Sequence, residues 1–275
     1  MLKLEEVTKK YGRKVVLQQI NLEFKDQAGV YGLLGRNGVG KTTMMKLIND
    51  MIASYDGRVS TSFDLAHIVF VTSDVSDYNS VFQGKITKLI RYYENMYPKF
   101  DAHYAEELLA RFNLDPKLKI KKLSTGNKTL VYNILGLATR ETVTVFDEPT
   151  NGLDSVNRQK FFDAMLEDYA QHPRLIILST HLIQEVENYL THVIMLKETA
   201  LLVDANIEDV QARAVRLTNA DLPNKYILHQ RQLGSTTETY LFDTITEEDI
   251  REVTGQGGQV GYYDLQTLFN YLVED

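Results

Sequence analysis

The chain has 275 residues, of which 44% are hydrophobic, 24% charged and 10% aromatic, a composition that excludes a disordered or fibrous protein. It contains no cysteine, which excludes disulfide bonds, thiolate metal sites and thiol nucleophiles. The apolar runs are far shorter than the ~18 residues of a membrane-spanning helix, and the first residues lack the apolar stretch of a signal peptide, so we expect a cytosolic protein.

The formal charge of -7 is unevenly distributed along the chain. Residues 1–205 carry 25 basic and 25 acidic side chains, whereas residues 206–275 carry 5 basic and 12 acidic ones. A nucleic-acid-binding protein needs a basic face to neutralise phosphates, and this distribution argues against that class.

Apolar periodicity over residues 1–205 predicts strands that alternate with helices. The predicted strands are a hairpin over 2–24 that turns at Tyr11 and Gly12, and single strands over 28–35, 65–71, 142–146 and 175–178. The predicted helices cover 41–51, 86–112 with a break at Pro98, and 155–170. This order indicates an α/β core with an antiparallel edge sheet and a helical insertion from about 80 to 122.

The pattern changes after about residue 206. Alternating stretches predict strands over 214–218, 226–230 and 239–242, followed by a helix over 247–253. A final helix begins after Asp264 as N-cap. Its apolar face carries Leu265, Leu268, Phe269 and Leu272. We therefore predict a small α+β extension at the C-terminal end.

Residues 35–42 match the phosphate-loop pattern G-x-x-x-x-G-K-[ST] in full, between a predicted strand and a predicted helix. Its glycines let backbone N–H groups turn toward phosphate oxygens, and the helix adds its positive dipole end. Lys41 is expected to reach the β- and γ-phosphates, and the Thr42 hydroxyl to bind Mg²⁺. The nucleotide-binding residues predicted here are Gly35, Arg36, Asn37, Gly38, Val39, Gly40, Lys41, Thr42 and Thr43. The loop predicts a protein that binds a nucleoside triphosphate.

Two carboxylates and a histidine follow predicted strands. Asp147 and Glu148 come directly after the strand over 142–146, at the strand end where open α/β sheets bind ligands. We expect Asp147 to hold Mg²⁺ through its water shell, and Glu148 to accept a proton from the water that attacks the γ-phosphate. His181 follows the next strand and is placed to contact the γ-phosphate or the attacking water.

These residues, with Leu-Ser-Thr-Gly-Asn at 123–127 and Asn-Gly-Leu-Asp at 151–154, resemble the nucleotide-binding subunit of ABC transporters over about residues 2–205. The resemblance implies a P-loop NTPase core of the ABC ATPase type. It implies that Ser124 and Gly126, in the signature segment, contact the γ-phosphate bound to the opposite protomer of a head-to-tail dimer. It also implies that Tyr11 stacks on adenine, that Asp154 joins the two protomers, and that Glu148 is the catalytic glutamate.

Two positions depart from the family pattern. Ser73 or Asp74 stands where the family has a glutamine that touches Mg²⁺, and Gln83 lies too far along the chain to replace it. Thr125 replaces a glycine of the signature segment, where a β-branched side chain hinders close approach to a phosphate. These departures predict slow hydrolysis, or one degenerate site in a heterodimer.

The resemblance implies an ATPase that powers a membrane transporter, with ATP and Mg²⁺ as cofactors. Residues 1–205 would form the nucleotide-binding domain and residues 206–275 an accessory extension. The partners would be a separate permease subunit, which the helical insertion receives, and a second cassette in a homodimer or heterodimer. The protein would then lie on the cytoplasmic face of the cell membrane, with no nucleic acid bound, and the short insertion and the C-terminal extension favour export.

Two other functions remain open at this point. One is a soluble ABC-type ATPase that acts as an ATP-gated regulatory or nucleic-acid-associated clamp, although no coiled coil, second cassette or basic face is visible. The other is an inactive, ATP-gated structural partner. The departures near residue 73 and at Thr125 favour it, whereas Glu148 and His181 argue against it.

Overall fold

The computed structural model describes residues 2–25, 28–72, 82 and 84–273. The chain forms two compact units, one of Met1–His181 with Ile194–Asp204 and one of Leu182–Val193 with Ala205–Asp275. The predicted domain boundary after residue 205 stays a prediction. The start of the predicted helical insertion, near residue 80, lies outside the described residues.

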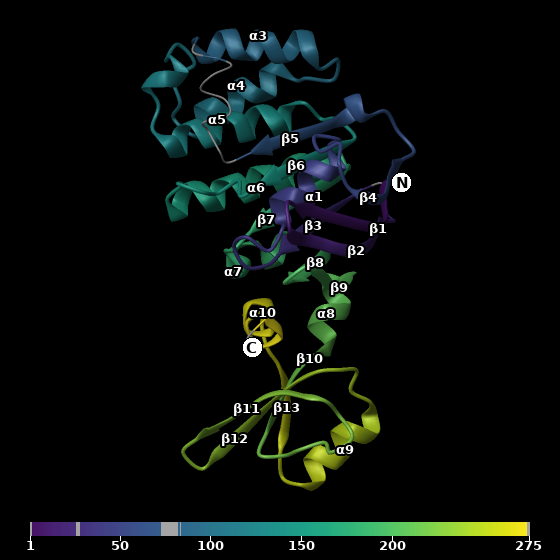
Figure 1. The fold of residues 1–275 in the computed structure, drawn as a ribbon. Coiled ribbons are helices and arrows are strands. Elements are labelled where there is room, and N and C mark those ends of the chain that lie inside the picture. The colour runs from purple at the N-terminus through teal and green to yellow at the C-terminus, as the bar shows by residue number, and fades with distance from the viewer. Residues whose placement is uncertain (1, 26–27, 73–81, 83, 274–275) are drawn as a thin grey trace. The chain divides into compact units, whose positions relative to one another are not determined.

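A six-stranded sheet in the order β5-β6-β7-β3-β8-β9 forms the centre of the first unit (Figure 1). Its strands are β3 (Gly29–Leu34), β5 (Ile68–Thr72), β6 (Val143–Asp147), β7 (Leu175–Thr180), β8 (His192–Lys197) and β9 (Ala200–Asn206). The pairs β5-β6, β6-β7 and β7-β3 are parallel. Every residue of β3, β6 and β7 is buried, as expected for parallel strands with both faces covered.

The register of these strands brings the predicted site residues together. Asp147 at the end of β6 pairs with Ser179 of β7, and Leu34 at the end of β3 pairs with Thr180. The phosphate loop follows β3, the acidic pair ends β6, and His181 follows β7. All three segments therefore leave the sheet at the same edge.

The predicted hairpin is confirmed in a second, three-stranded sheet in the order β2-β1-β4. Its strands are β1 (Leu2–Tyr11), β2 (Lys14–Phe24) and β4 (Asp56–Thr61), all antiparallel to their neighbours. Buried residues of β1 and β2, such as Leu4 and Leu22, share one hydrophobic core with Met44 and Ile48 of the phosphate-loop helix. This core supports the helix on which the phosphate loop depends.

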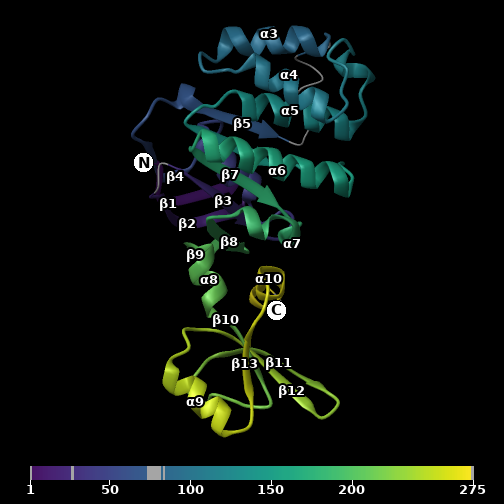
Figure 2. The ribbon, with the colours of Figure 1, turned by 180° about the vertical axis from the view of Figure 1, so that it is seen from behind.

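The helices of the first unit are α1 (Lys41–Ile48), α3 (Ile86–Met96), α4 (Ala102–Arg111), α5 (Thr125–Ala138) and α6 (Ser155–Gln171), with 3₁₀ turns η1 (Leu65–His67) and η2 (Ile120–Lys122). Figures 1 and 2 show α3, α4 and α5 stacked together. The break predicted at Pro98 separates α3 from α4, and α4 restarts at the N-cap Asp101, which accepts a hydrogen bond from the Tyr104 N–H.

Several predicted boundaries differ from the structure, and two of them have a clear local cause. The helix predicted over 41–51 ends at Ile48, because Asn49 caps it and Asp50 adopts a left-handed conformation with φ 54°. The strand predicted over 65–71 begins at Ile68, because Asp64 accepts a hydrogen bond from the Ala66 N–H and starts a 3₁₀ turn.

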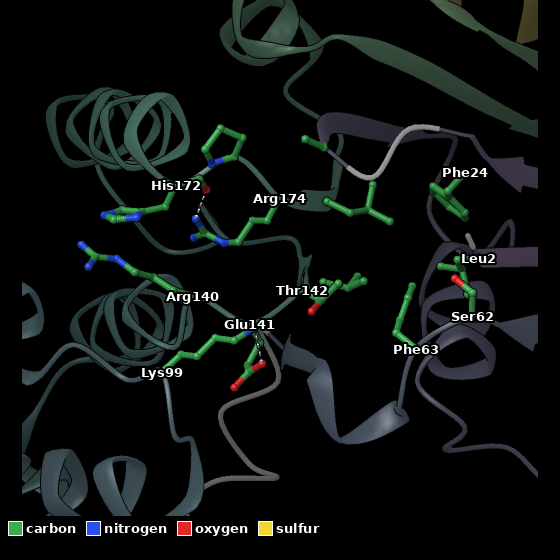
Figure 3. A pocket seen from close by; sticks show the side chains of 14 residues that line it. Leu2, Phe24, Ser62, Phe63, Lys99, Arg140, Glu141, Thr142, His172 and Arg174 are labelled. Carbon is green, nitrogen blue, oxygen red and sulfur yellow. Dashed lines mark hydrogen bonds and ion pairs between the residues drawn. The ribbon is translucent and has the colours of Figure 1, made fainter.

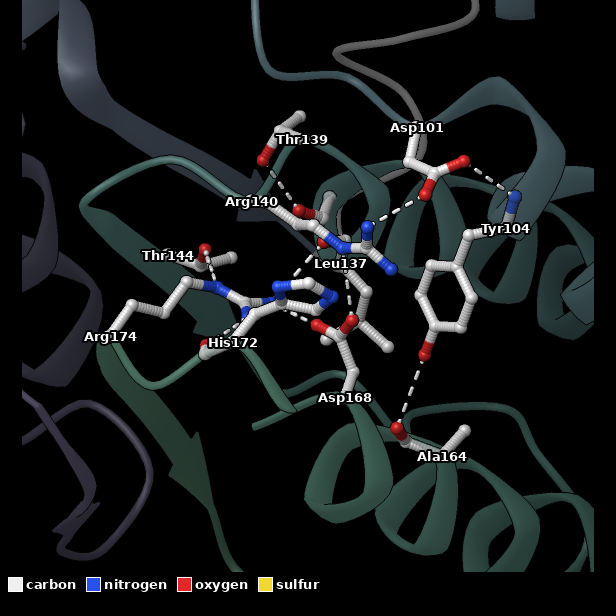
Figure 4. Close-up of polar contacts among 11 residues, drawn as sticks. Asp101, Tyr104, Leu137, Thr139, Arg140, Thr144, Ala164, Asp168, His172 and Arg174 are labelled. Carbon is white, nitrogen blue, oxygen red and sulfur yellow. Dashed lines mark hydrogen bonds and ion pairs between the residues drawn. The ribbon is translucent and has the colours of Figure 1, made fainter. Parts of the chain in front are cut away.

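A buried network of charges joins the insertion to the rest of the first unit (Figure 4). The Asp168 carboxylate in α6 lies 2.8 Å from the Arg174 guanidinium and 3.2 Å from that of Arg140. Arg140 also contacts Asp101 at 2.6 Å, and the Tyr104 hydroxyl donates to the Ala164 carbonyl at 3.2 Å. Asp168 therefore connects α4 and α6 through Arg140.

The second unit contains a four-stranded antiparallel sheet in the order β11-β12-β10-β13. Its elements are α7 (Ile183–Val186), η3 (Glu187–Tyr189), α8 (Ile207–Arg213), β10 (Ala214–Thr218), β11 (Ile227–Leu233), β12 (Thr236–Phe242), α9 (Glu247–Gly255), β13 (Gln259–Tyr262) and α10 (Leu265–Val273). Val215, Leu217 and Leu241 pack on Val253 of α9. Asp264 caps α10 as predicted, by accepting a hydrogen bond from the Thr267 N–H at 2.7 Å.

We predict that Asp168→Ala destabilises the first unit by about 3 to 5 kcal/mol, because it leaves the buried Arg174 guanidinium without its carboxylate. Glu167→Ala is the matched control on the same helix, since its ion pair with Arg111 is exposed and contributes at most about 1 kcal/mol. Urea unfolding of the two variants measures both values. Equal stability of the two variants would contradict the stabilising role of the buried Asp168–Arg174 ion pair.

Candidate nucleotide-binding site

A pocket of about 270 Å³ lies at the edge of the sheet where β3 and β6 end. It is lined by Val16 and by eight predicted site residues: Asn37, Gly38, Gly40, Lys41, Thr42, Thr43, Asp147 and Glu148. The loop residues Gly35, Arg36 and Val39 do not line it.

The phosphate loop is held closed by its own lysine. The Lys41 ammonium is 6% exposed and donates hydrogen bonds to the carbonyls of Gly35, at 2.7 Å, and Arg36, at 3.4 Å. Gly40 has φ 114°, and a Cβ there would lie 3.1 Å from the Val16 carbonyl oxygen, so this turn requires glycine. The loop is thus preformed around a cation that can exchange carbonyl partners for phosphate oxygens.

Burial lowers the pKa of Lys41 from its ordinary value, while the carboxylates of Glu148 and Asp147 act in the opposite direction. The Lys41 ammonium lies 3.8 Å from Glu148 Oε1. A bound phosphate would add negative charge beside Lys41 and favour its protonated form.

Asp147 is fixed by two hydroxyl groups. The Thr42 hydroxyl of the phosphate-loop helix donates to Asp147 Oδ2 at 2.7 Å, and the Ser179 hydroxyl of β7 donates to Oδ1 at 2.7 Å. Ser179 in turn accepts a hydrogen bond from the Glu148 N–H at 2.9 Å. Sequence reasoning missed Ser179, although its place near the end of a strand next to β6 is a signal that could have found it.

The donors at this position fit Mg²⁺. A hydroxyl and a carboxylate are the hard oxygen ligands that this cation prefers, and Mg²⁺ commonly takes one or two protein ligands together with phosphates and water. Within residues 2–25, 28–72, 82 and 84–273, no group of three or more His, Asp or Glu side chains forms an all-protein metal site.

Glu148 points toward His181. Its carboxylate Oε2 lies 2.8 Å from His181 Nδ1, and its side chain is 16% exposed, whereas that of His181 is 52% exposed. The Glu148 backbone has φ 49°, a left-handed conformation that a non-glycine residue adopts at some cost. The conformation places a carboxylate between the Lys41 ammonium and the imidazole, beside the pocket.

The signature segment is pressed against the loop that follows the acidic pair. Ser124 is the N-cap of α5 and accepts a hydrogen bond from the Asn127 N–H at 3.2 Å. A Cβ on Gly126 would lie 2.2 Å from the Gly152 carbonyl oxygen, so only glycine fits there. Thr125 is exposed in the first turn of α5.

The remaining predicted residues lie away from the pocket. Ser124, Gly126, Asp154 and Tyr11 do not line it. Asp154 caps α6, and the hydrogen bond from the Asn157 N–H lowers the pKa of its carboxyl. The Tyr11 ring is 51% exposed, with the Lys9 ammonium 4.7 Å from its centre. Ser73, Asp74 and Gln83 lie outside the described residues.

A larger pocket, of about 800 Å³, lies at the opposite ends of the same strands (Figure 3). Val143 and Leu175, the first residues of β6 and β7, line it together with Arg140, Glu141 and Arg174. No predicted site residue lines this pocket, and Arg140 and Arg174 already bind Asp168. The smaller pocket therefore remains the candidate site, because it carries the phosphate-binding groups.

The fold and the site define a P-loop nucleoside triphosphatase, with its phosphate loop between a buried strand and a helix and with two carboxylates at the end of a neighbouring strand. The sequence model of the "ABC transporter" family matches residues 17–151. The chain belongs to this family as an ATP-binding protein, and it is an ATPase.

Relatives and solved structures agree with this assignment. The ABC transporter ATP-binding protein YtrB of Bacillus subtilis is 27% identical over 89% of this chain and 86% of that protein. The lantibiotic transport ATP-binding protein SrtF of Streptococcus pyogenes is 27% identical over 68% and 83% of the two chains. The structure of cbiO1 from Clostridium perfringens, part of the ABC transporter complex cbiONQ, is 25% identical with a TM-score of 0.62, over 76% of this chain and 89% of cbiO1. Within the described residues, no helix has the length and apolar character needed to span a membrane.

We predict that Gly126→Ala destabilises the first unit by about 1 to 3 kcal/mol, because the new methyl group forces the signature segment away from Gly152. Gly255→Ala is the control, since its Cβ would meet no atom within 4 Å and should change stability by less than about 1 kcal/mol. Differential scanning calorimetry compares the two variants. A Gly126→Ala protein as stable as the parent would show that the two segments are not in close contact.

Proposed function

We propose that this protein binds Mg²⁺–ATP at the pocket beside β3 and β6 and hydrolyses it to drive transport through a separate membrane-spanning subunit. The observation that carries the proposal is the contact of Glu148 with His181, beside a preformed phosphate loop. A carboxylate in this position is a general base next to the γ-phosphate position, and the imidazole orients it.

Each group has a distinct role in the proposed reaction. Lys41 and the loop N–H groups bind the β- and γ-phosphates, and Thr42 and Asp147 hold Mg²⁺. The cation supplies charge neutralisation on the phosphate oxygens when it is bound. Glu148 takes the proton of the attacking water, and His181 holds the Glu148 carboxylate or contacts the γ-phosphate.

We propose that a second cassette completes the site. Ser124 and Gly126 do not line the pocket of their own chain, yet Ser124 offers a hydroxyl at the start of the 14-residue helix α5, where an anion is favoured. A head-to-tail partner, either a second copy or a related cassette, would bring its signature segment to the phosphates. Asp154 would then lie close to the junction, because its loop packs on the signature segment.

The membrane partner is also part of the proposal. YtrB is an ABC transporter ATP-binding protein, SrtF is a lantibiotic transport ATP-binding protein, and cbiO1 is part of the ABC transporter complex cbiONQ. We propose that this chain likewise acts on the cytoplasmic face of the cell membrane through a separate permease, with the helical insertion as its contact surface. We propose export as the direction, on the grounds of the short insertion and the C-terminal extension.

We predict that Glu148→Gln lowers the ATPase rate by about 10²- to 10⁴-fold, because an amide accepts no proton from water, while ATP affinity changes little. Glu107→Gln is the matched control, since that exposed carboxylate contacts only His103. An enzyme-coupled phosphate-release assay measures the rates of both. A Glu148→Gln protein that hydrolyses ATP at the parental rate would contradict the assigned base.

The same Glu148→Gln variant tests the second cassette by light scattering. With hydrolysis blocked, Mg²⁺–ATP should convert monomers into dimers of twice the mass. If the variant binds ATP and stays monomeric, a second copy of this chain does not supply the signature segment, and a different cassette must supply it.

A further inference from the structure

The second unit contains a hollow of about 480 Å³ that the proposed ATPase function does not use. It lies on the sheet face opposite α9, and its lining includes Arg216, Arg231, Tyr262 and Tyr271. Cross-strand pairing explains why these groups share a face. Arg216 pairs with Tyr240 and with Gly261, whereas its neighbours Val215 and Leu217 point into the core shared with α9.

The Arg216 side chain is 40% exposed, and one of its hydrogen-bond donors is buried. Its side chain makes no hydrogen bond with the described part of the chain, and its one ion pair, to Glu238, is 3.5 Å long. Its Nε is buried without a partner there. The guanidinium lies beside Gly261, where a Cβ would meet Nη2 at 3.7 Å, an ordinary contact distance. A buried donor normally has an acceptor, and a bound anion would supply one to Nε.

Arg231 lies across Glu238 from Arg216. Its Nε donates to Glu238 Oε2 at 2.7 Å, and its guanidinium carbon lies 5.4 Å from the centre of the Tyr240 ring. The hydrogen bond from the Tyr240 hydroxyl and the Arg231 guanidinium lower the pKa of the Glu238 carboxyl. Glu238 therefore stays ionised and pairs with one side of each guanidinium group. The other side of each guanidinium group is left to contact a ligand.

Aromatic rings form another part of the hollow, whose lining also includes Thr267 and Asn270. Tyr271 of α10 stacks on His229 at 4.3 Å between ring centres, with the rings 10° from parallel, and meets Tyr240 edge-on at 4.8 Å. The Tyr263 hydroxyl donates to the Leu241 carbonyl at 2.8 Å. Tyr262 is 64% exposed, so its ring is available to cover a ligand.

The charge distribution singles out this hollow. Residues 206–275 contain only 5 basic side chains against 12 acidic ones, and two of the basic ones, Arg216 and Arg231, line the same hollow. The carboxylate in the lining, Asp264, already caps α10 by accepting the Thr267 N–H at 2.7 Å. Two guanidinium groups beside stacked rings suit a planar anion, because a guanidinium binds carboxylate or phosphate oxygens in pairs.

We infer that this hollow binds a small organic anion, a carboxylate or phosphate carried on a planar ring. The Arg216 and Arg231 guanidinium groups bind the anionic oxygens, and the ring packs against Tyr262 and Tyr271. The lining of this hollow shares no residue with that of the nucleotide pocket, so its ligand would bind to the second unit independently of ATP.

The test is calorimetric titration of the full chain with phenyl phosphate, with the nucleotide pocket saturated by Mg²⁺ and a non-hydrolysable ATP analogue. We expect saturable binding that Arg216→Gln weakens by about tenfold or more and that Tyr262→Ala also weakens. Arg216→Lys should not restore it, because an ammonium lacks the planar pair of donors. Arg251→Gln, at an exposed arginine of α9, is the matched control and should leave affinity unchanged.

Further ligands separate the contribution of the anionic group from that of the ring. Inorganic phosphate and phenol should each bind more weakly than phenyl phosphate, and titration with benzoate shows whether a carboxylate replaces the phosphate. No saturable heat for phenyl phosphate and benzoate up to about 10 mM would overturn the inference. Parental affinity in Arg216→Gln would overturn it as well. If Arg216→Gln does not fold, parental affinity in Tyr262→Ala, which removes an exposed ring, is the overturning result.

Discussion

The site depends on one carboxylate held by two hydroxyl groups from separate parts of the chain. Asp147 accepts hydrogen bonds from Thr42, in the helix after the phosphate loop, and from Ser179, in the strand beside its own. Because the strands β3, β6 and β7 are parallel neighbours, their ends meet at one edge, and these bonds set the distance between the loop and the acidic pair. The position of Glu148, which we propose as the base, and its contact with His181 follow from that arrangement, since the Glu148 N–H is bound to Ser179.

The groups that we propose to bind phosphate line the pocket at this edge of the sheet, whereas the signature segment of the same chain does not line it. Gly126 packs against Gly152, and neither residue lines the chain's own pocket. In the proposed function, the single chain binds ATP and a second cassette encloses it. Closure on ATP would therefore depend on association, which is how ATP binding could be converted into movement of a membrane partner.

Much of the fold could be predicted from the sequence, because buried parallel strands are continuous apolar runs and the phosphate loop has a fixed spacing of glycines. The strands β4, β8, β9 and β13 and the helix α5 were not predicted. The strand β4, Asp56–Thr61, gave no apolar run because it is polar and partly exposed and lies at the edge of its sheet. Ser179 and the arginines of the second unit were missed for a different reason. Their significance depends on strand register, which places residues distant in sequence side by side. For Ser179 the one local signal is its place near the end of a strand, and the arginines have no such signal.

The most direct test of the site is calorimetric titration of ATP, with and without Mg²⁺, into the parent protein and Thr42→Val. Valine keeps the shape of threonine and removes the hydroxyl that reaches Asp147. We predict that Mg²⁺ raises ATP affinity in the parent, and that Thr42→Val loses this gain while it binds metal-free ATP as the parent does. A variant that keeps the full Mg²⁺-dependent gain would contradict the assignment of this edge as the Mg²⁺–ATP site.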